Sequence, residues 1–168
     1  MAEGDLFLKI VGEKQGEIKG ESEKKGKEGW TQIDSFNMGA VLPGSYGQHS
    51  GGGTGKVVFS DISFSTQASK ITPKIFQAMG NHERLKEVWF VARKGTGDQQ
   101  EDYLTLKLTD AVITNYNLSV SEHGAPMVSG TVNYKMIDVI YKPQNADQSL
   151  GAEVAYSFDQ SLGQASTA

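Results

Sequence analysis

The stretch Gly51–Lys56 is the part of the sequence closest to a catalytic motif, because Gly-Gly-Gly-Thr-Gly-Lys contains the glycines and the lysine of a phosphate-binding P-loop. Three features separate it from that motif. Ser50 stands where the opening glycine should be, Val57 follows where Ser or Thr would bind magnesium, and a β-type sequence follows where a helix should begin. The sequence therefore does not predict nucleotide binding.

Side chains suited to other chemistry are scattered along the chain. His49, His82 and His123 fall in three separate loop regions, without the spacing typical of metal ligands. The chain has no cysteine, which excludes disulfides, thiolate metal sites and a cysteine nucleophile. No serine elbow, zinc-protease motif or dinucleotide fingerprint is present, and no pair of carboxylates stands out as a glycosidase pair. We predict a protein that is not an enzyme and needs no metal or cofactor.

The composition indicates one mainly β domain. A length of 168 residues fits a single domain, and 20 glycines with few helix signals favour strands and turns. The net charge of −4 without a basic stripe makes nucleic acid an unexpected partner. The N-terminus has no signal-peptide pattern, and no apolar run reaches the length of a membrane span. We expect synthesis in the cytoplasm and no membrane insertion.

One helix is expected, and it is followed by a buried strand. Thr72 can cap the helix, Pro73 suits its first turn, and Ile75 and Met79 lie on one face. The following run Val88–Ala92 is apolar at alternating positions on both faces, as in a strand that is covered on both sides. We expect the single helix to pack over one face of a β core.

Most of the remaining chain alternates between apolar and polar residues, as strands do. The expected strands cover residues 5–12, 30–36, 57–65, 104–120 and 128–141. The last strand is apolar on both faces at Met136–Ile137 and at Val139–Tyr141. Such a strand either crosses between two sheets or is covered by another subunit.

Residues 37–55 are uncharged and contain seven glycines, yet they also contain Met38, Val41, Leu42 and Tyr46. Loops longer than about 12–15 residues are usually functional or disordered. A plain linker would not need four large apolar side chains, so we predict an extended arm that docks on another subunit. The alternative is a flexible surface loop.

Two further segments lie outside these strands. Residues 13–28 hold five lysines and five glutamates, which predicts a solvated rim or a surface that pairs with a second copy. Residues 144–168 form a C-terminal tail in which Val154, Tyr156 and Phe158 alternate, as in an additional edge strand, the alternative being disorder. We therefore divide the chain into a β domain of residues 1–143, with its extended loop at 37–55, and the tail.

Several short stretches stand in the order and at about the spacing of one known family. They are Leu6–Ile10, Ile18–Ser22, Gly55–Val57, Asp61–Phe64, Thr72–Ile75, Arg93–Lys94, Tyr103–Leu104, Lys107–Leu108 and Tyr141–Gln144. Over residues 5 to 145 the chain resembles the haemolysin-coregulated protein (Hcp) family, the tube proteins of bacterial type VI secretion systems. It departs from that family by lacking a cysteine near Ala78 and by an insertion around Val11–Gly16, which leaves subfamily and cargo open.

The resemblance implies a β-barrel of two packed antiparallel sheets with one short flanking α-helix. It also implies homohexameric rings that stack into a tube, export without a signal peptide, contact with tip and sheath components, and effectors held in the ring lumen. The expected subunit interface consists of Met38, Val41, Leu42, Tyr46, Ile137, Val139 and Tyr141. The expected lumen and cargo residues are Ser121, Glu122 and His123, beside Gly124.

Two other functions fit a β-rich chain of this size. One is the tail-tube protein of a phage-like particle, which shares the structural role without the secretion context. The other is a monomeric β-sandwich module that binds carbohydrate on Trp30, Tyr46 and Tyr116. The size of the protein in solution separates the second function from ring formation.

Overall fold

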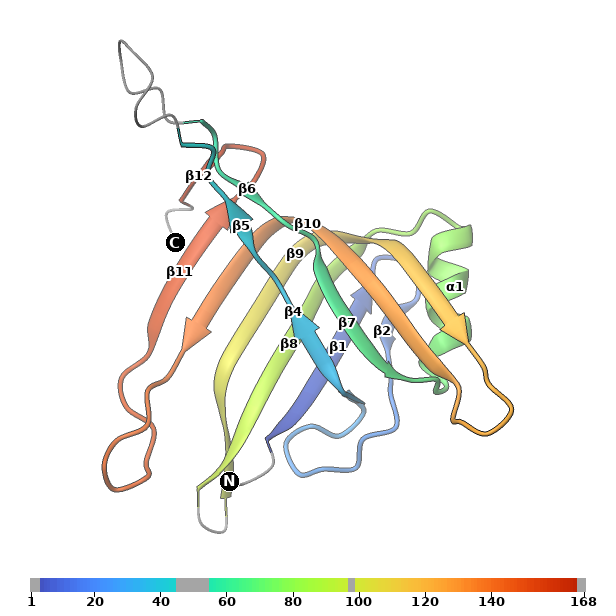
Figure 1. Cartoon of the computed structure of the whole chain (residues 1–168), viewed down its shortest axis with the longest axis horizontal. Helices are drawn as coiled ribbons and strands as arrows, with labels where there is room; N and C mark the ends of the chain where they lie inside the picture. The colour runs from blue at the N-terminus through green and yellow to red at the C-terminus, as the bar shows by residue number, and fades with distance from the viewer. Residues whose placement is uncertain (1–3, 45–54, 97–98, 166–168) are drawn as a thin grey trace.

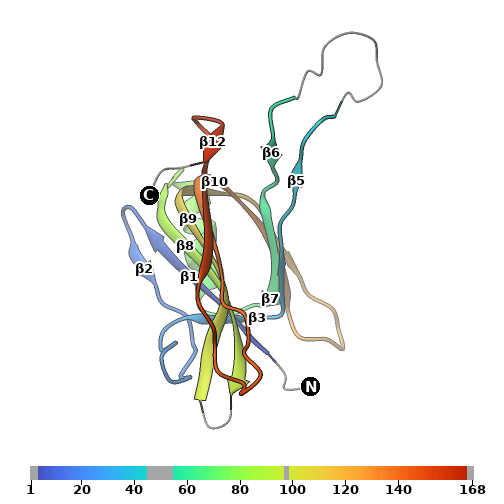
Figure 2. The same cartoon turned by 90° about the vertical axis from the view of Figure 1, so that its left-hand side faces the viewer.

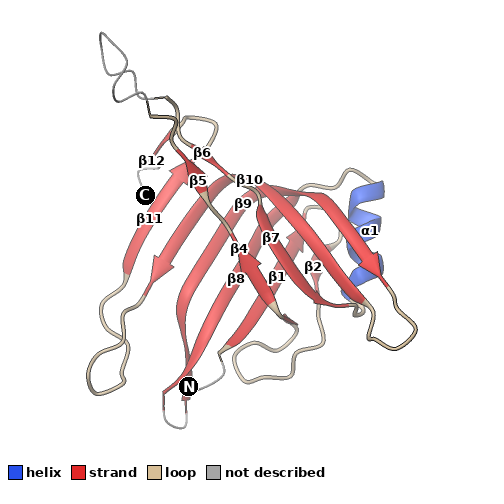
Figure 3. Ribbon diagram, viewed as in Figure 1, coloured by secondary structure: helices blue, strands red, loops and turns tan. Residues whose placement is uncertain are grey.

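The computed structural model describes residues 4–44, 55–96 and 99–165. Within these ranges the chain is mainly β, with a single helix at one side of the sheet (Figures 1 and 3). The elements are β1 (Asp5–Gly12), β2 (Gly16–Ile18), β3 (Thr31–Ile33), β4 (Ser35–Asn37), β5 (Ala40–Val41), β6 (Val58–Phe59), β7 (Ile62–Gln67), α1 (Ile71–Gly80), β8 (Leu85–Thr96), β9 (Gln99–Ser119), β10 (Met127–Tyr141), β11 (Val154–Asp159) and β12 (Gln164–Ala165).

Ten of these strands form one antiparallel sheet, with the order β12-β11-β10-β9-β8-β1-β2 along its main path. One edge of the long strand β10 pairs with β9. Along the other edge β10 pairs with two strands in turn: residues Met127–Val132 pair with β7, and residues Met136–Tyr141 pair with β11. The strand therefore passes from one layer of the molecule to the other, and Figure 2 shows β7 and β1 on different sides. This crossing accounts for the apolar residues on both faces of its sequence.

The two layers meet again at β3 and β4, which are consecutive and separated only by Asp34. β3 pairs with β1 and β4 pairs with β7, while the Asp34 N–H donates to the Ser65 carbonyl at 2.9 Å. Among the described residues no ladder joins β1 to β7, so the sheet is not closed into a barrel. The mainly β fold with one flanking helix is confirmed. Two sheets are present as predicted, but their division differs: ten strands form one sheet folded over itself, and β5 and β6 form a second, two-stranded ribbon.

The space between the layers is filled by apolar side chains from alternate strand positions. Phe64 connects the two layers, since its ring lies 5.8 Å from that of Phe90 and 6.3 Å from that of Tyr116. Gly130 on β10 makes room for these rings, because a Cβ there would lie 2.8 Å from Phe64 and 2.9 Å from Tyr116. Ile137 is also in this core, at 1% exposure.

Helix α1 covers one end of the core beside β9, with Ile75 and Ala78 buried. Its N-cap is Lys70, so the prediction that Thr72 caps the helix is wrong. Thr72 lies in the first turn, where its hydroxyl accepts a hydrogen bond from the Ser69 N–H at 3.2 Å. Among the described helices none is long and apolar enough to cross a membrane.

The strand β8 is buried on both faces, as predicted, but the helix is not its outer cover. Val91 and Phe7 point away from the main core and are nonetheless 1% and 0% exposed. The charge-rich segment of residues 13–28 lies against the outward side of β1 and β8. Trp30, just after this segment, connects the two: Lys27 Nζ sits 4.0 Å from the centroid of its ring, and Lys9 Nζ of β1 sits 5.6 Å from it. The prediction of a solvated rim is therefore wrong for Lys27, which is 6% exposed.

The Lys27 ammonium lies 2.8 Å from the Asp102 carboxylate, whose other oxygen lies 3.0 Å from Arg93 Nε. We expect Asp102→Ala to lower the free energy of unfolding by about 2 kcal/mol, because it leaves a buried ammonium without a carboxylate. This is less than for a fully buried pair, since the Asp102 side chain is 35% exposed.

The matched variant Lys27→Met removes the charge and keeps an apolar stem on Trp30, so its cost should stay below about 1 kcal/mol. Urea unfolding of both variants and of the double variant tests this order. A Lys27→Met protein less stable than Asp102→Ala would show that the charge itself, and not its burial without a partner, matters.

Candidate assembly surface

The ribbon of β5 and β6 projects beyond the body of the sheet (Figures 1 and 2). Ala40 pairs with Phe59 and Val41 with Val58, and the Gly55 N–H donates to the Pro43 carbonyl at 3.2 Å. Three of its apolar side chains face solvent, with Val41 65%, Leu42 57% and Val58 59% exposed. We call these three residues the ribbon tip.

The root of the ribbon is fixed to the body. Phe59 packs against Phe158 of β11 at a ring-centroid distance of 4.5 Å, and Met38 is half-buried against the core. The Lys56 side chain crosses the β11–β12 turn, where a Cβ at Gly163 would lie 2.3 Å from Lys56 Cε. The described part of the ribbon is thus held at its base, while the side chains of the ribbon tip are exposed. Tyr46, the fourth predicted docking residue of this loop, lies outside the described residues.

The predicted interface residues of β10 divide into buried and exposed ones. Ile137 belongs to the core of its own subunit and Val139 packs against that core. Tyr141 is 44% exposed, and its Cα partner across the ladder is Val154 of β11, which is 66% exposed. Tyr156, also on β11, is 50% exposed. We call Tyr141, Val154 and Tyr156 the apolar edge.

Sequence reasoning did not assign Val154, Tyr156 or Val58 to an interface. The alternation of Val154, Tyr156 and Phe158 in the sequence could have indicated an apolar strand face. Of these three residues, Phe158 points into the core, at 3% exposure. Among the described residues only Phe158 and Asp159 of β11 pair with β12, so the strand leaves most of its outer edge open. An open edge with apolar side chains is a surface to which another chain can add.

The outward side of the layer that contains β4 and β7 carries uncharged side chains along its register rows. Four strands contribute to it, and their register aligns two rows of side chains that we call the polar face. The first row is Asn117, Ser129, Ser65 and Ser35, and the second is Asn115, Thr131, Ser63 and Asn37. These side chains bond to one another, for example Ser35 Oγ to Ser65 Oγ at 2.7 Å.

A carboxylate borders the polar face at the start of β7. Asp61 accepts hydrogen bonds from Thr114 Oγ1 at 2.8 Å and from Asn133 Nδ2 at 2.7 Å. Burial, followed by the charge of Asp61, raises the pKa of the nearby Tyr134 to about 12, so this phenol stays neutral and donates to the Ser60 carbonyl at 2.9 Å. The border is therefore held by fixed hydrogen bonds.

The outward side of the layer that contains β1, β8 and the first half of β9 differs in chemistry. One register row runs through Lys9, Trp89, Lys107, Asp138 and Ser157, and we call it the charged row. Lys107 Nζ lies 5.0 Å from the Trp89 ring centroid and 3.7 Å from a Glu87 oxygen. One layer of the sheet thus carries mixed charges outward, while the other presents hydroxyl and amide groups.

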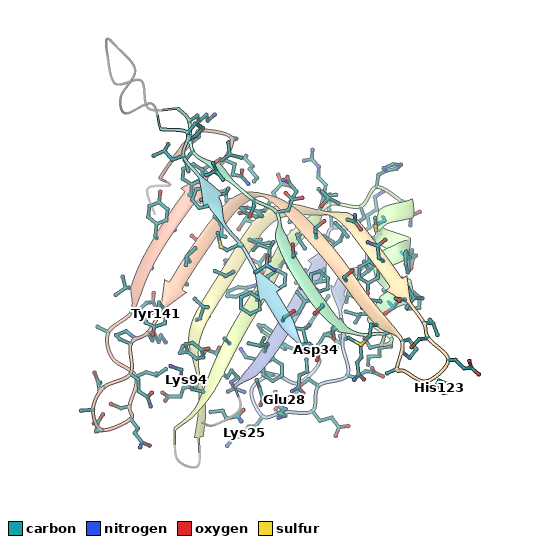
Figure 4. The ribbon with its side chains drawn as sticks, in the orientation of Figure 1. Lys25, Glu28, Asp34, Lys94, His123 and Tyr141 are labelled. Atoms are coloured by element: carbon teal, nitrogen blue, oxygen red, sulfur yellow. The ribbon has the colours of Figure 1, made fainter. Side chains whose placement is uncertain are left out.

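The predicted cargo residues lie at the tip of the β9–β10 hairpin, next to the polar face. Figure 4 shows His123 at this tip, at the opposite side of the view from Tyr141. The side chains of Glu122 and His123 are 90% and 92% exposed. The Gly124 N–H donates to the Ser121 carbonyl at 3.4 Å and closes the turn. The turn places these three residues together.

No group of three or more acidic, histidine or cysteine side chains within the described residues could hold a metal ion. The prominent features are a projecting apolar ribbon, an open apolar strand edge, and two sheet faces of different chemistry. These features define a β-sheet subunit built to contact other chains.

Comparison with known proteins identifies which subunit this is. The family model of the type VI secretion system effector Hcp matches residues 7–141. Protein hcp1 of Pseudomonas aeruginosa is 29% identical over 157 residues, which cover 92% of this chain and 94% of that protein. The chain belongs to the Hcp family, whose members are secreted tube proteins of type VI secretion systems.

Solved structures show the same fold. A type six secretion system protein superposes with a TM-score of 0.88 at 18% identity, covering 98% of this chain and 100% of the other. The crystal structure of an Hcp protein gives a TM-score of 0.73 at 25% identity, covering 94% and 99%. Family membership favours the structural tube role over a carbohydrate-binding module.

Proposed function

We propose that the ribbon tip of one subunit docks on the apolar edge of another copy within the ring or between stacked rings. The observation that carries this proposal is the presence, on one chain, of two different uncharged apolar surfaces, at the ribbon tip and at Tyr141, Val154 and Tyr156. Contacts between two different patches of identical chains close into rings or continue as filaments, both of which a tube requires. Burying one such side chain contributes about 1.5–3 kcal/mol.

The polar face is proposed to line the ring lumen. Rotational symmetry turns the same face of every copy toward the axis, so a charged inner face would confront its own like charges. The rows through Ser65 and Thr131 carry no charge, whereas Lys9, Lys107 and Asp138 lie on the other layer. The charged row then faces outward, where tip and sheath components of the secretion machine would contact the tube.

The Ser121–His123 turn is proposed to lie at the mouth of this lumen, because it ends the hairpin whose strands carry the polar face. Effectors held in the lumen would contact the turn and the polar face. In this role the protein is assembled in the cytoplasm and leaves the cell with its guest.

The absence of cysteine allows the inward face to be tested directly. Ser65→Cys on the polar face and Thr105→Cys on the other layer, where Thr105 pairs with Val91 and Ile140, each introduce one thiol at a partly exposed position. In rings verified as hexamers by light scattering, we expect the thiol at position 65 to react at least tenfold more slowly with a 20 kDa polyethylene glycol maleimide than the thiol at 105.

A small maleimide should label both positions at similar rates, which controls for local burial. Equal reaction of both thiols with the large reagent would place the polar face outside the lumen. Finding only an 18.2 kDa species across a wide concentration range would instead contradict assembly itself.

A further inference from the structure

The polar face has both hydrogen-bond donors and acceptors but no charge. Its eight side chains are five serine and threonine residues and three asparagines: Ser35, Asn37, Ser63, Ser65, Asn115, Asn117, Ser129 and Thr131. In a chain that is 21% charged, two adjacent rows across four strands contain no Asp, Glu, Lys or Arg. The lack of charge is therefore specific to this surface and is not a property of the whole sequence.

Hydroxyl and amide groups on this face remain available to a guest. Ser35, Asn37, Asn115, Asn117 and Ser129 are exposed. The bonds within the rows, such as Ser35 to Ser65, occupy only part of their capacity, since a hydroxyl offers one donor and two acceptor positions. A guest surface of similar groups can therefore exchange its bonds to water for bonds to the face.

Charged groups of a guest bind this face less favourably than neutral ones. An ion pressed against this face loses water and meets no counter-charge within the two rows, which is unfavourable. The Asp61 carboxylate lies outside the two rows, at their border, where it accepts hydrogen bonds from Thr114 and Asn133. The matching partner for a neutral hydrogen-bonding face is a neutral hydrogen-bonding surface.

We propose that this face selects guest proteins by an uncharged, Ser-, Thr-, Asn- and Gln-rich contact surface, so that guest binding is insensitive to salt. This rests on the proposed lumen position of the face and adds the chemistry of the partner. Charge attraction between exposed groups is screened with a Debye length of about 10 Å at 0.1 M salt, whereas neutral hydrogen bonds are not.

The test uses assembled rings and three forms of one small folded protein, ubiquitin, as probes: one with its surface charges replaced by Ser, Asn and Gln, one strongly positive and one strongly negative. Binding is measured by sedimentation at 50 and 500 mM NaCl. We expect the neutral form to bind at least tenfold more tightly than either charged form, with an affinity that changes less than twofold between the two salt concentrations.

Ring variants locate the effect. Ser65→Lys with Thr131→Lys should weaken binding of the neutral probe at least tenfold and create salt-dependent binding of the negative probe. Ser65→Asn with Thr131→Asn keeps the face neutral and should retain binding. Thr105→Lys with Ser157→Lys adds the same charge to the other layer and should change nothing.

The possible failures are distinct. Tighter binding of a charged probe by unmodified rings, no binding of the neutral probe, or an affinity that falls tenfold with salt would overturn the proposed selectivity. If Thr105→Lys with Ser157→Lys weakened binding of the neutral probe as much as Ser65→Lys with Thr131→Lys, the assignment of the polar face to the lumen would be overturned instead. Light scattering on every variant separates both outcomes from loss of the ring.

Discussion

The double substitution Val41→Asp with Leu42→Asp is expected to abolish ring formation at micromolar concentration and to leave a folded monomer. Both side chains are more than half exposed on the ribbon tip, so they contribute little to the fold of their own subunit. Each contributes about 1.5–3 kcal/mol when buried against a partner. An aspartate in the same contact would lose its water without finding a counter-charge. Together these effects should weaken each contact by at least about a hundredfold.

Light scattering and far-ultraviolet circular dichroism distinguish assembly from folding in this test. Val120→Asp is the matched control, because Val120 is 67% exposed but lies beside the β9–β10 turn. This control should form normal rings. Normal rings in the ribbon variant would show that the ribbon tip is not an assembly contact.

The second large effect is expected at Glu83, which is 3% exposed between α1 and β8. Its Oε1 accepts hydrogen bonds from the N–H groups of Lys14 and Gln15, both at 2.6 Å, and its Oε2 accepts one from Gln15 Nε2 at 2.8 Å. The carboxylate thus holds the β1–β2 turn against the helix end. Gly12 permits this approach, since a Cβ there would lie 2.8 Å from Oε1.

Glu83→Ala should lower the free energy of unfolding at pH 7 by about 3 kcal/mol, because two partly buried N–H donors lose a charged acceptor. Glu83→Gln keeps one carbonyl oxygen for these donors and should lose about half as much. Urea unfolding measures both variants. Equal stability of Glu83→Ala and the unmodified protein would contradict this role.

The effect of Glu83 should depend on pH. Burial raises the pKa of this carboxyl, but the hydrogen bonds from Gln15 and Lys14 outweigh burial and hold the pKa below its ordinary value of 4.5. A lowered pKa in the folded state means that the stabilisation is fully present above pH 4.5 and is lost as the pH falls through the folded pKa. The stability difference between Glu83→Ala and the unmodified protein should therefore be constant from pH 7 to about 5 and shrink below 4.5.

Local patterns in the sequence were sufficient for most individual elements. The alternation of residues 5–12 predicted β1, which spans Asp5–Gly12, and the doubly apolar run Val88–Ala92 lies in β8 and is buried on both faces. A two-residue period depends on neighbouring residues alone, so it can be read without knowing the fold. The ordered short motifs also indicated the Hcp family, which the family match confirms.

The ribbon was predictable only in part. The presence of Val41 and Leu42 in a glycine-rich uncharged stretch indicated a docking arm, and both side chains are exposed. The same reasoning could not show that Met38 anchors the root or that Ile137 faces its own core. An apolar side chain carries the same local signal whether its own subunit or another one covers it.

Tertiary structure alone decided the burial of Lys27 and the existence of the polar face. The Asp102 carboxylate that pairs with Lys27 lies 75 positions away along the chain. The polar face depends on the register of β4, β7, β9 and β10, which brings Ser35, Ser65, Ser129 and Asn117 into one row. Each of these residues by itself predicts only an outward position on a strand. Their adjacency comes from long-range hydrogen-bonded ladders, which no local period encodes.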